Sequence, residues 1–431
     1  VYKRQDLDQL IFELREILAA DFTHSPEAMS PEHLPASVGP GDEEELDFQA
    51  MSSILKESDL GEPIPESRRK RITGALEVID RIKPLFDITK VTKRKGKSKK
   101  TDQPLQMEII ENDCAAVFTR YNEQMKTLVE FFKAVEIARL EVANRYHEEI
   151  HDAFFDHFDL ANLTSTEVEL CPPILLVLTG EFFTKRNKGL LFDVLASEIP
   201  VKILVQLDNL LDSERLSESA DIIFGWQTRL AKMVMALDDI YVLQGPVSNA
   251  PLLQKSLMDG LRYSGPAVFC VFEGNRDDQP GLTTFHCGAT ATESRVFPAF
   301  TYDPGKGETL FDRTSISDNP RLDHEWSVGT FTYQSANGDE KTTELAFTPA
   351  DFLFGDIRLA QHFWRVPADK WHKDMIPVDQ YLKLDSDTVE SRIPYIAGVG
   401  MDGRVSRIVV TRAVLGAVES CSAFWRNIQE N

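Results

Sequence analysis

The sequence contains few cysteines and no closely spaced pair of them. Its 431 residues include five scattered cysteines, Cys114, Cys171, Cys270, Cys287 and Cys421. An odd number of scattered thiols is typical of a reducing compartment, so we expect a cytoplasmic location. Because no two cysteines form a CxxC pair, an iron–sulfur cluster bound by this chain alone is not expected.

Positive charge and long apolar runs are also scarce. The chain has 47 Lys and Arg against 69 Asp and Glu, which gives a formal net charge of −22. A phosphate backbone needs a basic surface, so nucleic acid is excluded as a main partner. No run of 18 apolar residues occurs, so we expect no membrane span. No signal peptide is visible, and the chain begins at Val1 rather than at a methionine, as a processed or partial chain would.

The first hundred residues predict helices joined by polar linkers. Apolar residues recur at helical spacing over 5–20, which predicts an amphipathic helix that needs a partner surface. A proline-rich, acidic linker is expected over 21–47, followed by a helix over Ser67–Ile82 that ends before Pro84. The basic segment Lys93–Lys100 has two open interpretations: a solvated loop, or a docking site for anions or an acidic partner.

Other elements are expected on either side of the centre of the chain. From about Met107 to Phe158 the sequence has few helix breakers and predicts two helices. Near the end, Tyr395–Val399 and Val405–Thr411 flank Asp402-Gly403, which predicts a β-hairpin with an Asp-Gly turn. Ala413–Gln429 is expected to close the chain as a helix.

The stretch from Pro172 to Asn209 has the pattern strand, loop, helix, strand. Two short runs of aliphatic and β-branched residues flank a segment whose apolar groups have helical spacing. Uninterrupted apolar runs are typical of strands buried in a parallel sheet. Ligands of such sheets lie beyond the carboxyl ends of the strands. We therefore expect Gly180–Glu181, after the first strand, and Asp208–Asn209, after the second, to face one crevice.

This stretch resembles the thiamine-diphosphate domain of the pyruvate (2-oxoacid):ferredoxin/flavodoxin oxidoreductases. The resemblance continues through Leu230–Tyr241 and Leu261–Phe272, where Tyr-Ser-Gly-Pro-Ala-Val-Phe-Cys-Val-Phe is similar to the family's last strand. The tail from Glu293 looks like the C-terminal extension of long, fused members. The resemblance implies a domain that binds thiamine diphosphate through Mg²⁺ and pairs across a two-fold axis. It also implies electron transfer to a ferredoxin-type acceptor through partner chains.

The chain departs from the family at the residues that hold the cofactor. Gly180-Glu181-Phe182 stands where the family has Gly-Asp-Gly, and the glycines expected after the second strand are missing. By position, Glu181 replaces the metal-binding aspartate, Asp208 or Asn209 would ligate a metal, and Lys185 would contact phosphate. Phe182 is expected to intrude on the diphosphate. We expect a crevice that has lost its cofactor; the alternative is a working site rebuilt around Glu181 and Asp208.

An HExxH sequence occurs at His147-Glu148-Glu149-Ile150-His151. In zinc peptidases this spacing places two histidines on the metal and a glutamate beside the metal-bound water. His157 has the spacing of a third ligand, but Phe154 stands where a glycine should end the helix. A continuous helix would turn His157 away from His147 and His151. We favour a solvated helix, with a metal at His147 and His151 as the alternative.

Together these patterns predict an α/β protein. We expect a helical N-terminal region with linkers over 1–105, a parallel-sheet domain of thiamine-diphosphate-binding type over 106–288, and an α+β C-terminal extension over 289–431. The expected function is that of a structural or scaffold component related to 2-oxoacid:acceptor oxidoreductases, with no cofactor of its own, in a homo-oligomer or larger oxidoreductase assembly. The alternatives are an active component that uses thiamine diphosphate and Mg²⁺, and a zinc peptidase.

Overall fold

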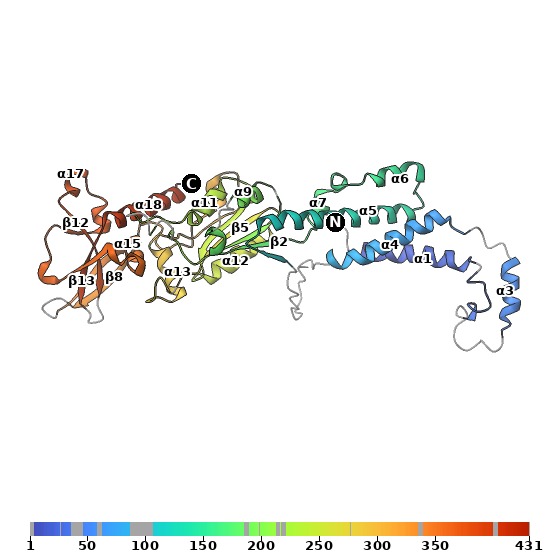
Figure 1. The fold of residues 1–431 in the computed structure, drawn as a ribbon, viewed down its shortest axis with the longest axis horizontal. Coiled ribbons are helices and arrows are strands. Elements are labelled where there is room, and N and C mark those ends of the chain that lie inside the picture. The colour runs from blue at the N-terminus through green and yellow to red at the C-terminus, as the bar shows by residue number, and fades with distance from the viewer. Residues whose placement is uncertain are drawn as a thin grey trace. The chain divides into compact units, whose positions relative to one another are not determined.

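The chain divides into two compact units (Figure 1). One comprises Val1–Met107 with Thr119–Pro172, and the other Glu108–Phe118 with Pro173–Asn431. This division differs from the three regions expected from the sequence, because segment 119–172 belongs with the N-terminal helices. The computed structural model describes residues 4–25, 27–35, 46–57, 63–86, 107–184, 189–197, 199–212, 216, 221–275, 277–334, 339–399 and 404–430. The basic segment Lys93–Lys100 lies outside them.

Unit 1, the N-terminal unit, is helical. Its elements are α1 (Arg4–Thr23), α3 (Phe48–Glu57), α4 (Glu66–Phe86), α5 (Cys114–Val142, mostly in this unit), α6 (Glu148–Asp156), η1 (Leu160–Asn162) and α7 (Ser165–Val168). The partner surface expected for the first helix is provided by α4 and α5, since residues such as Leu14, Ile79 and Leu128 pack in one core. In each helix the core positions recur every three or four residues, so one stripe is buried. No helix among the described residues is long and apolar enough to cross a membrane.

One of two helix boundaries in unit 1 differs from expectation. α4 continues past Pro84 to Phe86, because a proline in the last turn removes only one backbone hydrogen bond. The two helices expected between Met107 and Phe158 are α5 and α6, and the break between them contains Asn144, which adopts a left-handed φ of 52°. Asparagine tolerates this conformation, which ends a helix.

Glu108–Glu111 forms strand β1, although the sequence was expected to be helical from about Met107. The strand pairs in parallel with β2 (Ile174–Leu178), and its Ile109-Ile110 pair is β-branched. Asn112 follows with φ of 53°, and the Asp113 carboxylate then accepts hydrogen bonds from two N–H groups in the first turn of α5, both at 3.0 Å. The chain thus passes from strand to helix within two residues.

The core of unit 2, the larger unit, is a seven-stranded sheet with the order β1-β2-β3-β5-β4-β6-β7. Strands β1 to β5 are parallel, and β6 and β7 are antiparallel additions at one edge. The remaining strands are β3 (Lys202–Leu207), β4 (Tyr241–Pro246), β5 (Ala267–Phe272), β6 (Phe300–Tyr302) and β7 (Thr314–Ser315). The strand–helix–strand pattern read from 172–209 is confirmed, because β2 and β3 are parallel neighbours joined through α9.

Helices cover both faces of this sheet (Figure 1). α12 packs on the face that carries Tyr241, Leu243 and Phe269, whereas α11 lies on the opposite face. Right-handed crossovers explain this arrangement, since the chain moves in opposite directions along the sheet through the two helices. The helices of this part are α8 (Gly180–Thr184), α9 (Gly189–Ala196), η2 (Trp226–Arg229), α11 (Leu230–Met235), α12 (Ala250–Arg262) and α13 (Thr284–Glu293).

The C-terminal part of unit 2 adds a hairpin, a second sheet and a closing helix. The predicted hairpin is confirmed as antiparallel β12 and β13, and its Asp402-Gly403 turn lies outside the described residues. The elements here are α14 (Leu310–Arg313), β8 (Ser327–Gln334), β9 (Glu340–Phe347), α15 (Pro349–Phe354), η3 (Ile357–His362), β10 (Phe363–Val366), η4 (Ala368–Lys370), β11 (Met375–Pro377), α16 (Val378–Tyr381), α17 (Ser386–Val389), β12 (Ile393–Val399), β13 (Val405–Val410) and α18 (Arg412–Gln429).

One buried cation lies at the start of β3. The ammonium group of Lys202 donates hydrogen bonds to the carbonyl oxygens of Tyr263 and Gly265, both at 2.6 Å, and the residue is 2% exposed. Burial lowers its pKa from 10.5 to about 8. The unfolded chain therefore keeps this proton up to a higher pH than the folded chain does.

We expect the free energy of unfolding to rise between pH 8 and 10.5 through Lys202, because the unfolded state binds more protons in this window. The slope should exceed that of Lys202→Met by up to about 1.4 kcal/mol per pH unit. Urea unfolding at a series of pH values measures both slopes, and Lys255→Met, a change at an exposed residue of α12, is the control. Equal slopes for wild type and Lys202→Met would contradict the shift.

Candidate functional site

The carboxyl ends of β2, β3 and β5 meet at a crevice of about 390 Å³. Gly180 follows β2, Asp208 and Asn209 follow β3, and Asp278 lies beyond β5. The crevice expected from the sequence is therefore present, with Gly180, Asp208 and Asn209 brought together. Its lining residues are Gly180, Phe183, Gln206, Leu207, Asp208, Asn209, Leu211, Asp212, Trp226, Gln227, Asn275, Asp278 and Arg358.

Gly180 lies directly against Asp208. A Cβ atom added to Gly180 would stand 3.2 Å from the Asp208 Oδ1 atom, so the glycine permits this close approach. Glu181 is exposed and is not among the residues that line the crevice. Glu181 and Asp208, expected to share a metal, are therefore not brought together on the crevice wall. Lys185 lies outside the described residues.

The aromatic wall of the crevice comes from a different phenylalanine than expected. Phe182 is buried and does not line the crevice, so the expectation that it intrudes on the site is wrong. Phe183 lines it instead and meets Trp226 edge to face, with ring centroids 5.2 Å apart. The difference arises because Gly180–Thr184 is helical, and successive side chains on a helix point in different directions.

Arg358, from the start of η3, links the loops around the crevice. Its guanidinium lies 3.0 Å from an Asp278 carboxylate oxygen and 2.6 Å from one of Asp356. It also donates a hydrogen bond of 3.1 Å to Oδ1 of Asn209. Burial raises the pKa of Asp278; Arg358 opposes this, and Asp356 and Asp208 add to it. Burial also disfavours the charge of Arg358, but Asp356, Asp278 and Asp208 raise its pKa overall.

These residues do not fit a magnesium diphosphate. Arg358 is the one cation among the described lining residues, and two carboxylates already neutralise it. Asp208 and Asp212 add two further carboxylates to the lining, which would repel a diphosphate that carries no metal ion. Among the described residues, no cluster of three or more His, Cys, Asp or Glu side chains has the arrangement needed to hold a metal ion. The charges that line the crevice favour an internal network of ion pairs over a phosphate-binding site.

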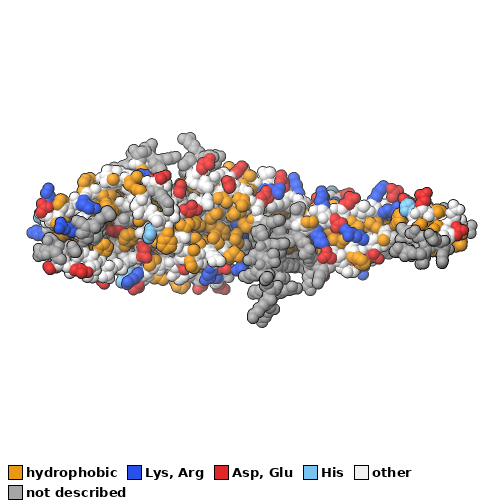
Figure 2. Space-filling view, turned by 90° about the horizontal axis from the view of Figure 1, so that it is seen from below, with side chains coloured by type: hydrophobic (Ala, Val, Ile, Leu, Met, Phe, Trp, Pro, Cys, Tyr) orange, Lys and Arg blue, Asp and Glu red, His pale blue; other side chains and the backbone are white. Residues whose placement is uncertain are grey.

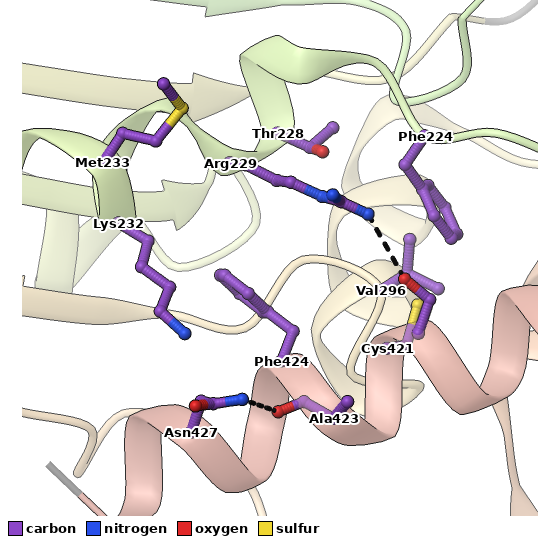
Figure 3. Close-up of a pocket in the computed structure, with 11 residues that line it drawn as sticks. Phe224, Thr228, Arg229, Lys232, Met233, Val296, Cys421, Ala423, Phe424 and Asn427 are labelled. Carbon is purple, nitrogen blue, oxygen red and sulfur yellow. Dashed lines mark hydrogen bonds between the residues drawn. The ribbon is translucent and has the colours of Figure 1, made fainter.

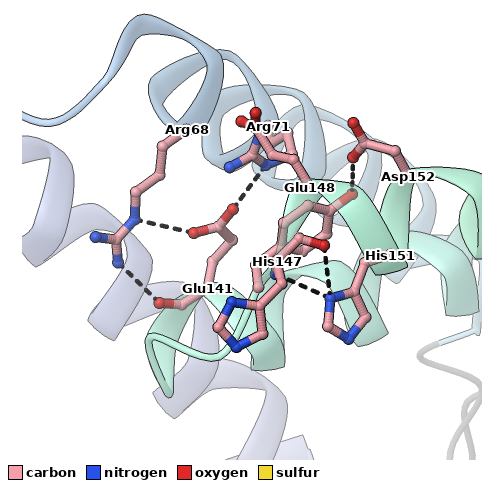
Figure 4. A network of polar contacts seen from close by, with 8 residues as sticks. Arg68, Arg71, Glu141, His147, Glu148, His151 and Asp152 are labelled. Atoms are coloured by element: carbon pink, nitrogen blue, oxygen red, sulfur yellow. Dashed lines mark hydrogen bonds and ion pairs between the residues drawn. The ribbon is translucent and has the colours of Figure 1, made fainter.

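The HExxH sequence spans the start of α6 in unit 1 (Figure 4). His147 precedes the helix as its N-cap residue, and its N–H donates a hydrogen bond of 2.9 Å to Nδ1 of His151. The two rings are close, with centroids 6.0 Å apart. His157 ends the helix as its C-cap residue. The continuous helix expected through the HExxH sequence is confirmed as α6, with His147 and His157 at its two ends.

Glu148 is poorly suited to act as a general base. Its carboxylate pairs with the Arg71 guanidinium at 2.5 Å, and this hydrogen bond lowers the pKa of Glu148. A carboxylate with a lowered pKa accepts a proton less readily than a free one. The glutamate of the motif therefore forms an ion pair that links α4 and α6.

Arg71 also belongs to a buried network (Figure 4). Glu141, 1% exposed, accepts hydrogen bonds from Nε of Arg68 at 2.9 Å and from Nε of Arg71 at 2.8 Å. Arg68 also reaches the Glu141 carbonyl oxygen at 3.0 Å. The last turn of α5 is thereby fixed to the first turns of α4.

Sequence patterns did not identify Arg358, Asp278 or Trp226. Asp278 could have been found from its position shortly after a predicted strand, as Asp208 was. Arg358 lies 149 residues from its partner Asn209, and no local pattern links the two. No family model matches the chain, and no curated protein matches it.

We expect Glu141→Gln to lower the free energy of unfolding of the helical unit by about 3 kcal/mol, because it leaves two arginines around a buried neutral group. Glu148→Gln is the matched control, since this exposed carboxylate has only outer contacts, with Arg71 and Ser67, and should change stability little. Urea unfolding followed by circular dichroism compares them. Equal losses of unfolding free energy in the two variants would contradict a stabilising role for buried Glu141.

We expect Arg358→Gln to destabilise the sheet unit by about 3 kcal/mol near neutral pH, since Asp278 and Asp356 then face each other without a cation. The Asp278 pKa would rise further, so the folded state would bind more protons than the unfolded state just above the ordinary pKa of aspartate. The deficit should therefore shrink as the pH falls toward 5.

Arg262→Gln is the control for Arg358→Gln, because Arg262 is 65% exposed and its Asp259 partner is 3.8 Å away. Thermal unfolding at two pH values measures both variants. A deficit of Arg358→Gln that does not depend on pH would contradict the network.

Proposed function

We propose that this chain is a structural or scaffold component related to the 2-oxoacid:acceptor oxidoreductases, and that its strand-end crevice does not bind thiamine diphosphate. The kinship is supported by the segments quoted above for the resemblance. One of these segments contains the parallel strands β2 and β3, and another contains β5. That this sheet belongs to the thiamine-diphosphate-binding type of fold is part of the proposal. So is a cytoplasmic location, in keeping with five cysteines that form no disulfide bond in the part of the chain that the structure describes.

One observation carries the loss of the cofactor site. All three nitrogens of the Arg358 guanidinium contact Asp356, Asp278 or Asn209 at the strand ends. A diphosphate entering there would have to displace these carboxylates and would meet Asp208 and Asp212 as well. Thiamine diphosphate supplies carbanion chemistry where it is bound, so a chain that does not bind it has no such reaction.

A scaffold role requires surfaces for other chains. Figure 2, which views unit 2 from the side of α12, shows apolar side chains gathered on this face. Met258 of α12 and Phe285 of α13 are among the exposed large hydrophobic residues of unit 2, at 44% and 57% exposure. We propose that this unit self-associates or joins a larger oxidoreductase assembly, in which a ferredoxin-type acceptor would act through partner chains.

Isothermal titration of the full chain with thiamine diphosphate and Mg²⁺ tests the proposal. We expect no saturable binding at millimolar cofactor, because Arg358, the one cation among the described lining residues, is already paired with Asp278 and Asp356. Saturable binding that is lost in Glu181→Gln or Asp208→Asn would overturn the proposal in favour of a rebuilt enzyme site. Stoichiometric zinc in the purified protein, lost together with peptidase activity in His147→Ala, would favour the peptidase instead.

Light scattering tests the assembly. We expect a mass above that of the 48.7 kDa monomer for the chain alone or with partner chains from its source. Met258→Glu together with Phe285→Glu should reduce it, because charges would enter the apolar face. A monomer at all concentrations, with no partner retained, would contradict a scaffold role.

A further inference from the structure

A second hollow in unit 2 lies between the η2–α11 segment and the closing helix α18 (Figure 3). Its volume is about 500 Å³, within the range of small-molecule pockets. Phe224, Val296, Met233 and Phe424 supply apolar walls from segments far apart in the chain. Such walls favour the apolar part of an organic molecule over an inorganic ion.

Two cations reach into this hollow. Arg229 ends η2 and Lys232 lies one turn later in α11, so both side chains lie on the same helical face. The Arg229 guanidinium lies 3.3 Å from the Ser420 hydroxyl, and the Lys232 ammonium lies 5.4 Å from the centroid of the Phe424 ring. Both cations therefore point toward α18.

Neither cation is neutralised within the part of the chain that the structure describes. The described residues that line the pocket include no Asp or Glu, and neither Arg229 nor Lys232 forms an ion pair with a described residue. Burial, and then the charge of Arg229, lower the pKa of Lys232. Like charges one turn apart destabilise a helix, so an anion between them would relieve this repulsion.

We infer that this pocket binds a small organic carboxylate with an apolar body. The carboxylate lies between Arg229 and Lys232, where the Ser420 hydroxyl adds a further donor. The apolar body lies against Phe224, Phe424 and Val296. This binding function goes beyond the proposed scaffold role and involves a different surface from the strand-end crevice, so either can fail without the other.

Titration of the full chain with 2-naphthoate, followed by the fluorescence anisotropy of the ligand, tests the inference. We expect saturable binding that weakens about ten-fold or more in Lys232→Gln and in Arg229→Gln, because each loses a charged hydrogen-bond donor. The neutral analogue 2-naphthalenemethanol should bind the wild type no more tightly than 2-naphthoate binds these two variants. Lys255→Gln, which removes one exposed lysine on α12, is the matched control and should bind as the wild type does.

A second measurement locates the ligand. In a sample labelled at the methionine methyl groups, we expect 2-naphthoate to shift the NMR signal of Met233, which lines the pocket, and to leave Met258 on α12 unchanged. Each signal is assigned with a Met→Leu variant. Binding that is unaffected by both charge changes, equal binding of the neutral analogue, or an unshifted Met233 signal would each overturn the inference.

Discussion

The carboxyl edge of the parallel sheet depends on the charge of Arg358. This one guanidinium contacts Asn209 after β3, Asp278 beyond β5 and Asp356 in its own loop. It holds carboxylates close together that would otherwise repel one another. The same contacts join the C-terminal part of unit 2 to the strand ends. The edge at which α/β proteins commonly bind ligands is here used for an internal connection.

Paired and unpaired charges distinguish the sites of this protein. In the helical unit, Glu141 is enclosed by Arg68 and Arg71, and each group satisfies the other. Such networks are structural, because no charge remains to attract a ligand. Arg229 and Lys232 have no carboxylate partner among the described residues and lie in an apolar hollow. This contrast assigns ligand binding to the hollow beside α18 rather than to the strand ends or to the HExxH segment.

The sequence predicted features that arise from short stretches of chain. The strands β2, β3 and β5 were recognisable because each is a continuous apolar run bounded by polar residues or proline, and the strand-end rule then located Gly180, Asp208 and Asn209. Short-range exceptions were missed. β1 lies where helix was expected, and its four residues are too few for a clear periodicity. Helix rotation decided that Phe183 rather than Phe182 lines the crevice. Arg358 was not predictable, because its partners Asn209 and Asp278 are distant in sequence and charge alone does not identify an ion pair.

The most direct test of the closed crevice is the NMR signal of the Arg358 Nε–H group, assigned by its loss in Arg358→Lys. If Asp356 and Asp278 occupy the guanidinium, addition of magnesium pyrophosphate should leave this signal unshifted up to millimolar concentration. A shift that saturates with pyrophosphate would show that phosphate displaces the carboxylates, and would contradict the account of a crevice that has been closed from within.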